Sequence, residues 1–500
     1  MAADLDPRRW RALPVILVGS FLSFLDFFIV NIALPAMRDD LGARPADPQL
    51  VVAGYGIGFA VFLVTGGRLG DIFGRKRMFL AGLAGFTLTS GLCGLAPTPT
   101  VLIAARVLQA ITAATLVPQV LAIIRMEFAP HERPVAIGLY GTSMGLASIV
   151  AQLVGGLLVS LDLFGWSWRL IFLINVPIGL GAIGLASRMV RESRSARRPT
   201  LDLAGVELAS LSLFLLIYPI VEGREAGWPA WSLVMLAATL PVLVGFVYHE
   251  RGVLRRGQSP LVALPLLRIR TIALGLVTSV VFFGGVGAFF VVLTLFFQSG
   301  FGYSAFTAGL LFLPFAIGFS AASALSGPIT ARIGGWIVNL GIRLMALDLM
   351  GVITLARLAQ TAPVAAALPA TAALDERLLV ALFLVYGLGQ GLGQPALINT
   401  VIGGSRVSGE DAGSAAGLFL TTAQSSIALG VAAIGGVFFT RLGPVPTATS
   451  YVDALSLALS CNLVLLGAAF VLMLVLLLPG RHRWAPAAVV DVPPPMSGSR

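Results

Sequence analysis

One short stretch decides the fold of this chain: Gly66-Gly67-Arg68-Leu69-Gly70-Asp71-Ile72-Phe73-Gly74-Arg75-Lys76-Arg77. It lies between two long apolar runs, Leu50 to Leu69 and Met78 to Leu95. We therefore expect a short connection at a membrane surface. Its glycines allow two helix ends to approach closely, and Asp71 can face the positive N-terminus of another helix. The three basic residues that follow Gly74 mark the cytoplasmic side of a membrane.

The composition of the whole chain excludes a soluble protein. Of its 500 residues, 57% are hydrophobic and 11% are charged, and the mean hydropathy is +0.94. A soluble domain carries about 25% charged residues. The net charge of +10 is spread over short loops and forms no basic domain, so we expect no nucleic-acid partner. Cys93 and Cys461 fall inside apolar runs, which argues against a disulfide framework.

Apolar runs of about 20 residues predict an all-α polytopic membrane protein with fourteen transmembrane helices. These are expected at 12–36, 49–69, 78–96, 101–125, 135–159, 168–188, 203–222, 230–248, 272–297, 305–328, 335–357, 378–402, 411–438 and 454–478. An even number places both termini on one side, and most of the 33 Lys and Arg residues fall on that side. Because basic loops are retained in the cytoplasm, we expect both termini inside, at the plasma membrane.

The segment Ser326 to Gly335 is a weak second copy of the opening stretch, with Ala331 in the position of Asp71. The last six helices therefore repeat the plan of the first six, and two helices lie between them. The expected parts are a cytoplasmic N-terminus (1–11), an N-terminal six-helix bundle (12–190), a linker with a two-helix insert (191–256), a C-terminal six-helix bundle (257–478) and a disordered cytoplasmic tail (479–500).

The pattern G-x-L-x-D-x-x-G-R-K/R around Asp71 resembles the loop between the second and third helices of major facilitator superfamily transporters. The six-plus-two-plus-six layout is similar to the fourteen-helix drug:proton antiporter branch of that superfamily, whose fold has two pseudo-symmetric bundles. The resemblance implies that the stretch is a gating loop that closes the cytoplasmic side. The residues carried over are Gly67, Gly70, Asp71, Gly74, Arg75 and Lys76. Glu127, at the end of the fourth helix, is placed to contact Arg75, and a solvated helix-end glutamate is the alternative.

The first helix carries Asp26 within Leu25 to Pro35, which resembles the first-helix signature of this branch. A carboxylate deep in the bilayer costs about 2.5–3.5 kcal/mol, so an intramembrane Asp usually has a function and faces the protein interior. On the fourth helix, Arg106 to Ala110 resembles the arginine motif of the family. We expect Arg106 to pair with Asp26 and to release it when Asp26 takes up a proton. A permanent structural ion pair is the alternative.

The fifth helix resembles the antiporter motif of the family, whose small residues pack against the other half of the transporter. The glycines of the motif are Gly141, Gly145, Gly155 and Gly156. Where the family has Gly-Pro, this chain has Ala151 and Gln152, so the motif supports the fold more than the direction of transport. The segment Trp166 to Gly179 also resembles this branch, and we expect it to anchor a helix end at the membrane interface.

Polar, uncharged side chains are expected to line a substrate cavity: Asn31, Gln109, Gln390, Gln394 and Asn399. Six phenylalanines between Phe282 and Phe297 are candidates for stacking on an aromatic substrate, and we expect at least half of them to face lipid instead. Arg343 and Asp348 are charged within the eleventh helix. Five residues apart, they project about 140° away from each other and need other partners.

The sequence predicts a monomeric, proton-coupled exporter of small lipophilic compounds, such as drugs or antibiotics, that works by alternating access in the lipid bilayer. An ATP-driven pump is excluded, because the chain has no G-x-x-x-x-G-K-[ST] loop and Lys76 is its only lysine. We expect no enzyme, cofactor or metal, because His131, His249 and His482 fall in loops or the tail. The alternatives are an exporter of one natural product or lipid, and a non-transporting receptor or scaffold.

Overall fold

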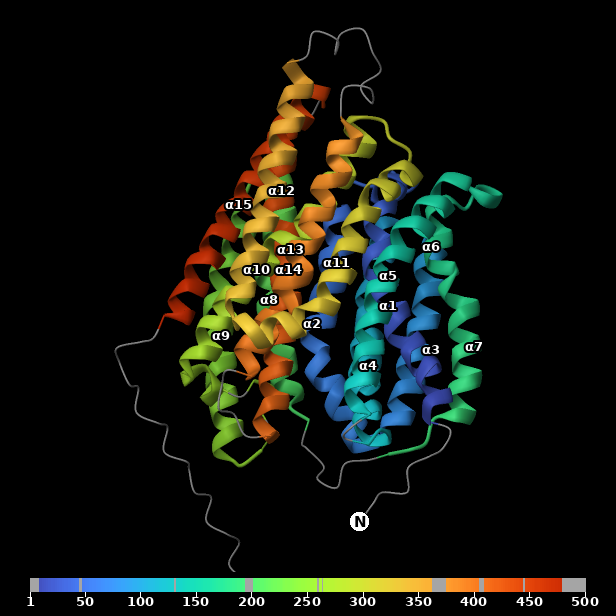
Figure 1. The fold of residues 1–500 in the computed structure, drawn as a ribbon, viewed down its shortest axis with the longest axis vertical. Coiled ribbons are helices and arrows are strands. Elements are labelled where there is room, and N and C mark those ends of the chain that lie inside the picture. Colours follow the sequence, from blue (N-terminus) through green and yellow to red (C-terminus); the bar gives the residue numbers. More distant parts are fainter. Residues whose placement is uncertain are drawn as a thin grey trace, which may run out of the picture.

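The computed structural model describes residues 9–44, 47–129, 132–193, 201–258, 260–262, 264–361, 375–403, 409–443 and 446–478. Within these residues the secondary structure is helical throughout, and Figure 1 shows the long helices running side by side. The N-terminus as far as residue 8 and the predicted tail from 479 lie outside the described residues, as do His131, His482 and part of the linker after 193.

The first helices are α1 (Arg9–Leu41), α2 (Asp47–Phe73), α3 (Arg75–Gly94), α4 (Pro99–Glu127), α5 (Arg133–Leu161), the short α6 (Leu170–Leu173) and α7 (Asn175–Met189). The next two are α8 (Leu203–Glu225) and α9 (Ala230–Arg255). The remaining helices are α10 (Arg270–Leu295), α11 (Ala305–Ile333), α12 (Trp336–Thr361), α13 (Glu376–Gly403), α14 (Gly409–Leu442) and α15 (Ala448–Leu477).

Each of the fourteen predicted segments corresponds to one helix of the structure, with α6 and α7 together forming one span. Thirteen of the spans in the described residues are long and apolar enough to cross a membrane. The fourteenth, α3, begins with three basic residues, Arg75 to Arg77, which lower its hydropathy. The chain is therefore a multi-pass, all-helical membrane protein. We call the side on which α1 begins the inner side.

The opening stretch is not a loop. α2 continues to Phe73 and α3 begins at Arg75, so only Gly74 separates the two helices. Gly74 has a φ of 109°, a conformation that residues with a side chain rarely adopt. The prediction of a connection over 70–77 was wrong because the helix extends beyond the apolar run that marks the membrane core. This near-continuous turn fixes the inner ends of α2 and α3 beside each other.

The helices form two groups that meet along two seams. α1 to α7 pack on one another and form the N-terminal group, and α10 to α15 form the C-terminal group. The seams are α5 against α11 and α2 against α14. α8 packs on both α2 and α14, while α9 packs mainly on α8 and is largely exposed, at the edge of the bundle in Figure 1. The six-plus-two-plus-six division remains a prediction.

The six phenylalanines from Phe282 to Phe297 lie in the core of the C-terminal group. Each is at most 3% exposed, so the expectation that at least half of them face lipid was wrong. They occur as pairs at intervals of seven residues, which places them on one stripe of the helix. The stripe faces other aromatic rings: the Phe289 ring stacks on Tyr386 with the ring centres 3.9 Å apart. The phenylalanines therefore fill the bundle interior and do not form an open substrate surface.

Candidate functional site

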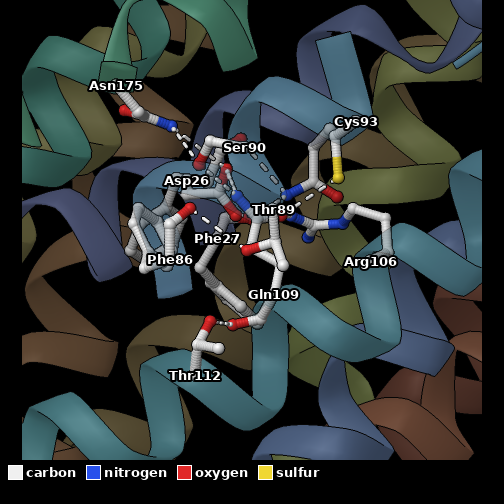
Figure 2. Close-up of polar contacts among 12 residues, drawn as sticks. Asp26, Phe27, Phe86, Thr89, Ser90, Cys93, Arg106, Gln109, Thr112 and Asn175 are labelled. Carbon is white, nitrogen blue, oxygen red and sulfur yellow. Dashed lines mark hydrogen bonds and ion pairs between the residues drawn. The ribbon is translucent and has the colours of Figure 1, made fainter. Parts of the chain in front are cut away.

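The N-terminal group holds a buried ion pair at its centre. Asp26 in α1 and Arg106 in α4 are 0% and 1% exposed, and Nη1 of Arg106 donates to Oδ2 of Asp26. The other carboxylate oxygen, Oδ1, accepts from Gln109 Nε2 at 3.0 Å and from Asn175 Nδ2 at 3.4 Å. Figure 2 shows the carboxylate between Asn175 on one side and Arg106 on the other. The structure thus brings together the two residues that the sequence proposes for proton coupling.

Gln109 connects this ion pair to α3. Its Oε1 accepts from Arg106 Nη1 at 2.6 Å, and its Nε2 also donates to Ser90 Oγ at 2.8 Å. The thiol of Cys93 lies 3.6 Å from the same Oε1. Gln109 is fully buried, so in this conformation it belongs to the ion-pair network and not to an open substrate cavity.

Aromatic rings support the guanidinium of Arg106. Its Cζ lies 4.2 Å from the ring centre of Tyr55 in α2 and 5.6 Å from that of Phe172 in α6. A cation over an aromatic face gains about 0.5–2 kcal/mol, depending on how far it is desolvated. Arg106 therefore has a second set of contacts, the rings and Gln109, that can hold it while Asp26 is neutral. A proton can bind Asp26 without leaving the guanidinium unsupported.

The two faces of α1 connect the ion pair to the C-terminal group. Phe28 lies two residues after Asp26, which is about 200° around the helix. On that opposite face its ring meets Phe290 of α10, with the ring centres 5.9 Å apart. One turn further, the carbonyl of Ile32 accepts from Gln298 Nε2 at 2.8 Å. α1 thus carries the ion pair on one face and a contact with the C-terminal group on the other.

Sequence reasoning missed Asn175. The segment Trp166 to Gly179 does anchor the outer end of this helix, since Trp168 Nε1 and Arg169 Nη2 bond Asp40 Oδ2 at 2.9 and 3.0 Å. The same segment also places Asn175, which is fully buried, against Asp26. An amide in an otherwise apolar span was the signal for this second role.

The predicted gating stretch, Gly66 to Arg77, is held by contacts within the N-terminal group. Asp71 forms an ion pair with Arg75 one turn later, at 2.8 Å. The carboxylate of Glu192, which follows α7, accepts from the backbone amides of Lys76 and Arg77 at 3.1 and 3.3 Å. Glu192 thereby satisfies free N–H groups at the start of α3, where a negative charge is favourable. No sequence signal pointed to it, because the contact joins residues more than a hundred positions apart.

Glu127 does not meet Arg75 in this conformation. The Arg75 guanidinium contacts Asp71 instead, and within the described residues its Nε and Nη1 have no hydrogen-bond partner. In the family, a contact of this kind is expected when the inner side is closed, so for that conformation the pair stays a prediction. Gly67 and Gly70 lie on α2 where it packs on α4, and a Cβ on Gly70 would be 1.9 Å from Gln119 Oε1. Close packing of α2 on α4 thus explains that glycine.

Asp202, His249 and Glu250 form a second ionisable cluster, at the inner ends of α8 and α9. The prediction that His249 lies in a loop was wrong, since α9 extends to Arg255. Elsewhere on the inner side, Arg9 Nη2 lies 2.7 Å from Glu132 Oε1, and this contact lowers the pKa of Glu132 to about 2. That ion pair fastens the start of α1 to the start of α5.

The remaining predicted cavity residues do not converge. Asn31 donates to the carbonyls of Phe27 and Phe28 in its own helix, both at 3.3 Å. In α13, Gln390 Nε2 donates to Gln394 Oε1 at 3.2 Å, one turn away. Asn399 is exposed near the inner end of the same helix. In this conformation the residues stand at three separate places, so a common substrate cavity remains a prediction.

The charged residues of α12 have different surroundings. Asp348 is fully buried, and among the described residues neither of its oxygens has a hydrogen-bond partner. Arg343 is exposed, and its guanidinium lies 5.1 Å from the ring centre of Phe470 in α15. They do not pair, as the angle between them predicts. Asp348 is the second carboxyl group in the membrane core that can bind a proton.

The seam between α5 and α11 is closed on the outer side and open on the inner side. A Cβ on Gly156 would lie 2.7 Å from the Ala305 carbonyl oxygen, and one on Gly145 would lie 2.5 Å from Ser320 Oγ. Gly141, one turn further inward on the same face, is exposed with nothing within 4 Å of its Cβ position. Gly155 faces α1 instead, against Ile29. The inner part of the seam is therefore accessible in this conformation.

These distances predict different effects for two identical substitutions in α5. Gly156→Ala places a methyl group against backbone of α11 that cannot move aside, and we expect a loss of about 1–3 kcal/mol of stability. Gly141→Ala meets open space and is expected to leave stability unchanged or slightly raised. Thermal unfolding of the two purified variants measures the difference. Equal unfolding midpoints would show that the seam is not closely packed at Gly156.

Two of the cavities in the described residues that lie outside the ion-pair network differ in character. One, of about 560 Å³, opens at the outer ends of α1, α5 and α15 and has polar lining residues such as Arg38, Asp39 and Gln298. The other, of about 330 Å³, is mostly apolar and lies between α2, α8, α9, α10 and α14, where its lining includes Val61, Phe246 and Leu418. Both groups and the pair α8 and α9 contribute to the apolar cavity.

The chain matches the family model described as Major Facilitator Superfamily over residues 16–431. It belongs to the major facilitator superfamily. It is 40% identical over 443 residues to a "Probable actinorhodin transporter" of Streptomyces coelicolor, covering 88% of this chain and 74% of that protein. It is also 34% identical over 319 residues to "Multidrug resistance protein Stp" of Mycobacterium tuberculosis, covering 63% and 58% of the two chains. As a member of this superfamily, the chain is a transporter of small molecules.

A solved structure shares the fold of this superfamily member. It is described as a bacterial homologue of the human lysosomal transporter Spinster, and its TM-score with this chain is 0.63. The match covers 94% of this chain and 97% of that one at 16% identity. At that identity the likeness shows the fold alone, and it agrees with the two-group arrangement of the helices.

Proposed function

We propose that this superfamily member is a proton-coupled exporter of small lipophilic compounds, not an enzyme, and that it works as a monomer by alternating access. The observation that carries the proposal is the buried pair of Asp26 and Arg106. A carboxylate in the membrane core costs free energy of insertion, so such a group usually has a function. A carboxylate that a proton can neutralise is suited to proton transfer. The relatives named as an antibiotic transporter and a multidrug resistance protein support export.

In the proposed cycle, Asp26 takes up a proton from the outer side as substrate leaves, and Arg106 shifts to Gln109 and the ring of Tyr55. The two groups then rock about the seams, and the proton is released to the inner side. The membrane potential supplies about 2.3 kcal/mol per 100 mV for each proton. The gating stretch around Asp71 and Arg75 closes the inner side in the outward-facing state.

The proposed location is the plasma membrane, with both termini in the cytoplasm. Two sets of basic residues lie on the inner side, Arg75 to Arg77 at the start of α3 and Arg255 and Arg256 at the end of α9. Their position supports this orientation. The apolar cavity between the groups is the proposed route or site for lipophilic cargo, because its lining lacks charged side chains.

A narrower function is favoured by one comparison. The Streptomyces relative is named for a single compound, which supports a dedicated exporter of one natural product. The Mycobacterium relative is named for multidrug resistance, which supports a broad range. The Asp26 network serves either function, since it touches no residue of the apolar cavity. A lipid as cargo is the remaining alternative.

Transport in inside-out vesicles tests the proposal and separates the alternatives. With an imposed pH gradient, acidic inside the vesicles, we expect the native chain to accumulate a fluorescent lipophilic cation or actinorhodin, the compound for which the Streptomyces relative is named. Accumulation of many unrelated compounds indicates a broad exporter, and accumulation of one chemical class indicates a dedicated one. Vesicles without the protein give the background. A folded chain that moves none of the compounds contradicts drug export.

A further inference from the structure

The inner ends of α8 and α9 bring together three ionisable side chains that the ion pair at Asp26 does not involve. Asp202 caps the start of α8, and His249 and Glu250 lie near the end of α9. One potential ligand atom from each of the three lies within 4.8 Å of the others. Glu250 is 0% exposed and Asp202 is 9% exposed, so the two carboxyl groups are shielded from water.

Each carboxyl group is bonded through one oxygen only. Asp202 Oδ1 accepts from the Gly205 amide at 2.8 Å and lies 2.7 Å from His249 Nε2. Glu250 Oε2 accepts from the Val262 amide at 2.8 Å. The other oxygens, Oδ2 of Asp202 and Oε1 of Glu250, have no hydrogen-bond partner within the described part of the chain.

These two unpartnered oxygens converge on one point. A Cβ built on Gly205 would lie 2.5 Å from Asp202 Oδ2 and 2.6 Å from Glu250 Oε1. Glycine is therefore required here to leave space for both oxygens. Two buried carboxylate oxygens that face each other repel strongly unless a positive charge lies between them, and a proton is the smallest such charge.

The charge count of the cluster also calls for one proton. Arg68 in α2 donates to the Pro260 carbonyl and lies close enough to interact with the charges of both Asp202 and Glu250. With His249 neutral, one arginine opposite two carboxylates leaves a net charge of −1 in a shielded site. Each helix at the site contributes a charged or titratable group: Arg68 from α2, Asp202 from α8, and His249 and Glu250 from α9.

We propose that Asp202 and Glu250 share one proton, and that this site, held against Arg68, links the pair of helices α8 and α9 to the gating stretch. In the protonated state seen here, Arg68 donates to the Pro260 carbonyl. Loss of the proton adds a negative charge that draws Arg68 towards α8 and α9 and holds the inner end of α2 more firmly in this position, whereas with the proton bound α2 is freer to move. The link to gating rests on the proposed transport function, whereas the proton site does not.

The hydrogen bonds place the proton on Glu250. Burial raises the pKa of Asp202, but hydrogen bonds from His249 and the Gly205 amide outweigh burial and hold this pKa below its usual value. Asp202 therefore stays ionised and accepts from the protonated carboxyl of Glu250. The same donor set of one imidazole and two carboxylates suits Zn²⁺. The nearby guanidinium opposes a divalent cation, which favours the proton.

Unfolding of the purified full-length chain tests the proton site. If the native cluster holds a proton that the unfolded chain releases, the native state binds more protons, and the unfolding midpoint falls as pH rises from about 5 to about 8. Glu250→Gln puts an N–H where the shared proton lies. We expect it to reduce this fall and to raise the midpoint at the alkaline end. Glu207→Gln, an exposed glutamate in α8, is the matched control and keeps the native slope.

Three results distinguish a shared proton from a permanently ionised pair and from a bound metal. Asp202→Asn retains the helix cap and also supplies an N–H, so it is expected to flatten the pH dependence as Glu250→Gln does. If both variants lower the midpoint at every pH and leave the slope unchanged, the pair is permanently ionised and the proposal is wrong. If added ZnCl₂ raises the midpoint of the native chain but not that of Glu250→Gln, the site holds a metal and the proton assignment is overturned.

A labelling experiment tests the link to gating without any substrate. Gly141→Cys adds a thiol at the open inner part of the α5 seam, where a membrane-impermeant maleimide reaches it from the inner side. Because a maleimide reacts with the thiolate, labelling of any exposed cysteine rises with pH, so the readout is the labelling of Gly141→Cys divided by that of Gly141→Cys with Glu250→Gln at the same pH. Because the ionised cluster holds α2 in the conformation with an open inner side, this ratio is expected to rise with pH. The chain without the added cysteine gives the background from Cys93 and Cys461. A ratio that does not change with pH would refute the link, and would leave proton-coupled export untouched.

Discussion

Asp26→Asn is expected to abolish accumulation driven by a pH gradient while the chain remains folded. One pH unit is worth about 1.4 kcal/mol per proton, so one coupled proton sustains about a tenfold concentration ratio of substrate. Asparagine is similar in shape to the carboxylate but cannot bind and release a proton at these pH values, so the ratio is expected to fall to about one. The measurement is uptake of a fluorescent lipophilic cation into inside-out vesicles with and without the gradient. Arg106 keeps its contacts with Gln109 and Tyr55 in this variant, which favours a folded protein.

The matched control for this experiment is Asp453→Asn. Asp453 is an exposed carboxylate at the outer side that pairs with Arg441 at 2.7 Å, and its replacement is expected to leave accumulation unchanged. Thermal unfolding of each variant verifies that the chain is folded. Gradient-driven accumulation that persists in folded Asp26→Asn would move the proton site elsewhere. The buried carboxyl of Asp348 would be the next residue to replace.

Arg106→Gln is expected to cost about 3–5 kcal/mol of stability, because it leaves the carboxylate of Asp26 buried without its counter-charge. The double variant Asp26→Asn with Arg106→Gln removes both charges and is expected to recover most of that loss. It is not expected to recover coupled transport, since no titratable group remains at the site. Denaturant or thermal unfolding of the native chain, the two single variants and the double variant gives the interaction energy.

Arg343→Gln is the control for the arginine substitution. Arg343 is exposed in α12 and its guanidinium lies over the face of Phe470, so its replacement is expected to change stability by less than about 0.5 kcal/mol. If Arg106→Gln also costs less than about 1 kcal/mol, the ion pair is not a true charge pair. Asp26 would then already be neutral in the folded chain, and release by Arg106 would not be part of the cycle.

The helices could be predicted from the sequence because the length of each apolar run matches the thickness of the membrane core. Each of the predicted spans corresponds to one observed helix. The ends could not be predicted as well, because a helix does not stop where the hydrocarbon stops. α2 extends past its apolar run to Phe73, and α9 extends past His249 to Arg255. Polar residues in these last turns lie near the water, and apolar periodicity carries no information about them.

The Asp26 site could be predicted in part for a similar reason. Asp26 and Arg106 are charges in apolar spans, and a charge in the membrane core needs a partner, so a pair was foreseeable. Asn175 and Glu192 were missed because their roles depend on contacts between helices distant in sequence. The burial of the phenylalanine stripe was missed because periodicity gives the shared face of a helix but not whether that face meets lipid or protein.

The position of Asp26 separates the coupling machinery from the cargo. Every described contact of its carboxylate comes from α4 or α7, within the N-terminal group, while the apolar cavity is lined from both groups and from α8 and α9. Under the proposed function, substrate and proton therefore do not compete for one group, and an inhibitor bound in the apolar cavity is expected to block turnover without preventing Asp26 from exchanging its proton. Under the same proposal, substitutions in that cavity would change the range of substrates and leave the energy coupling intact.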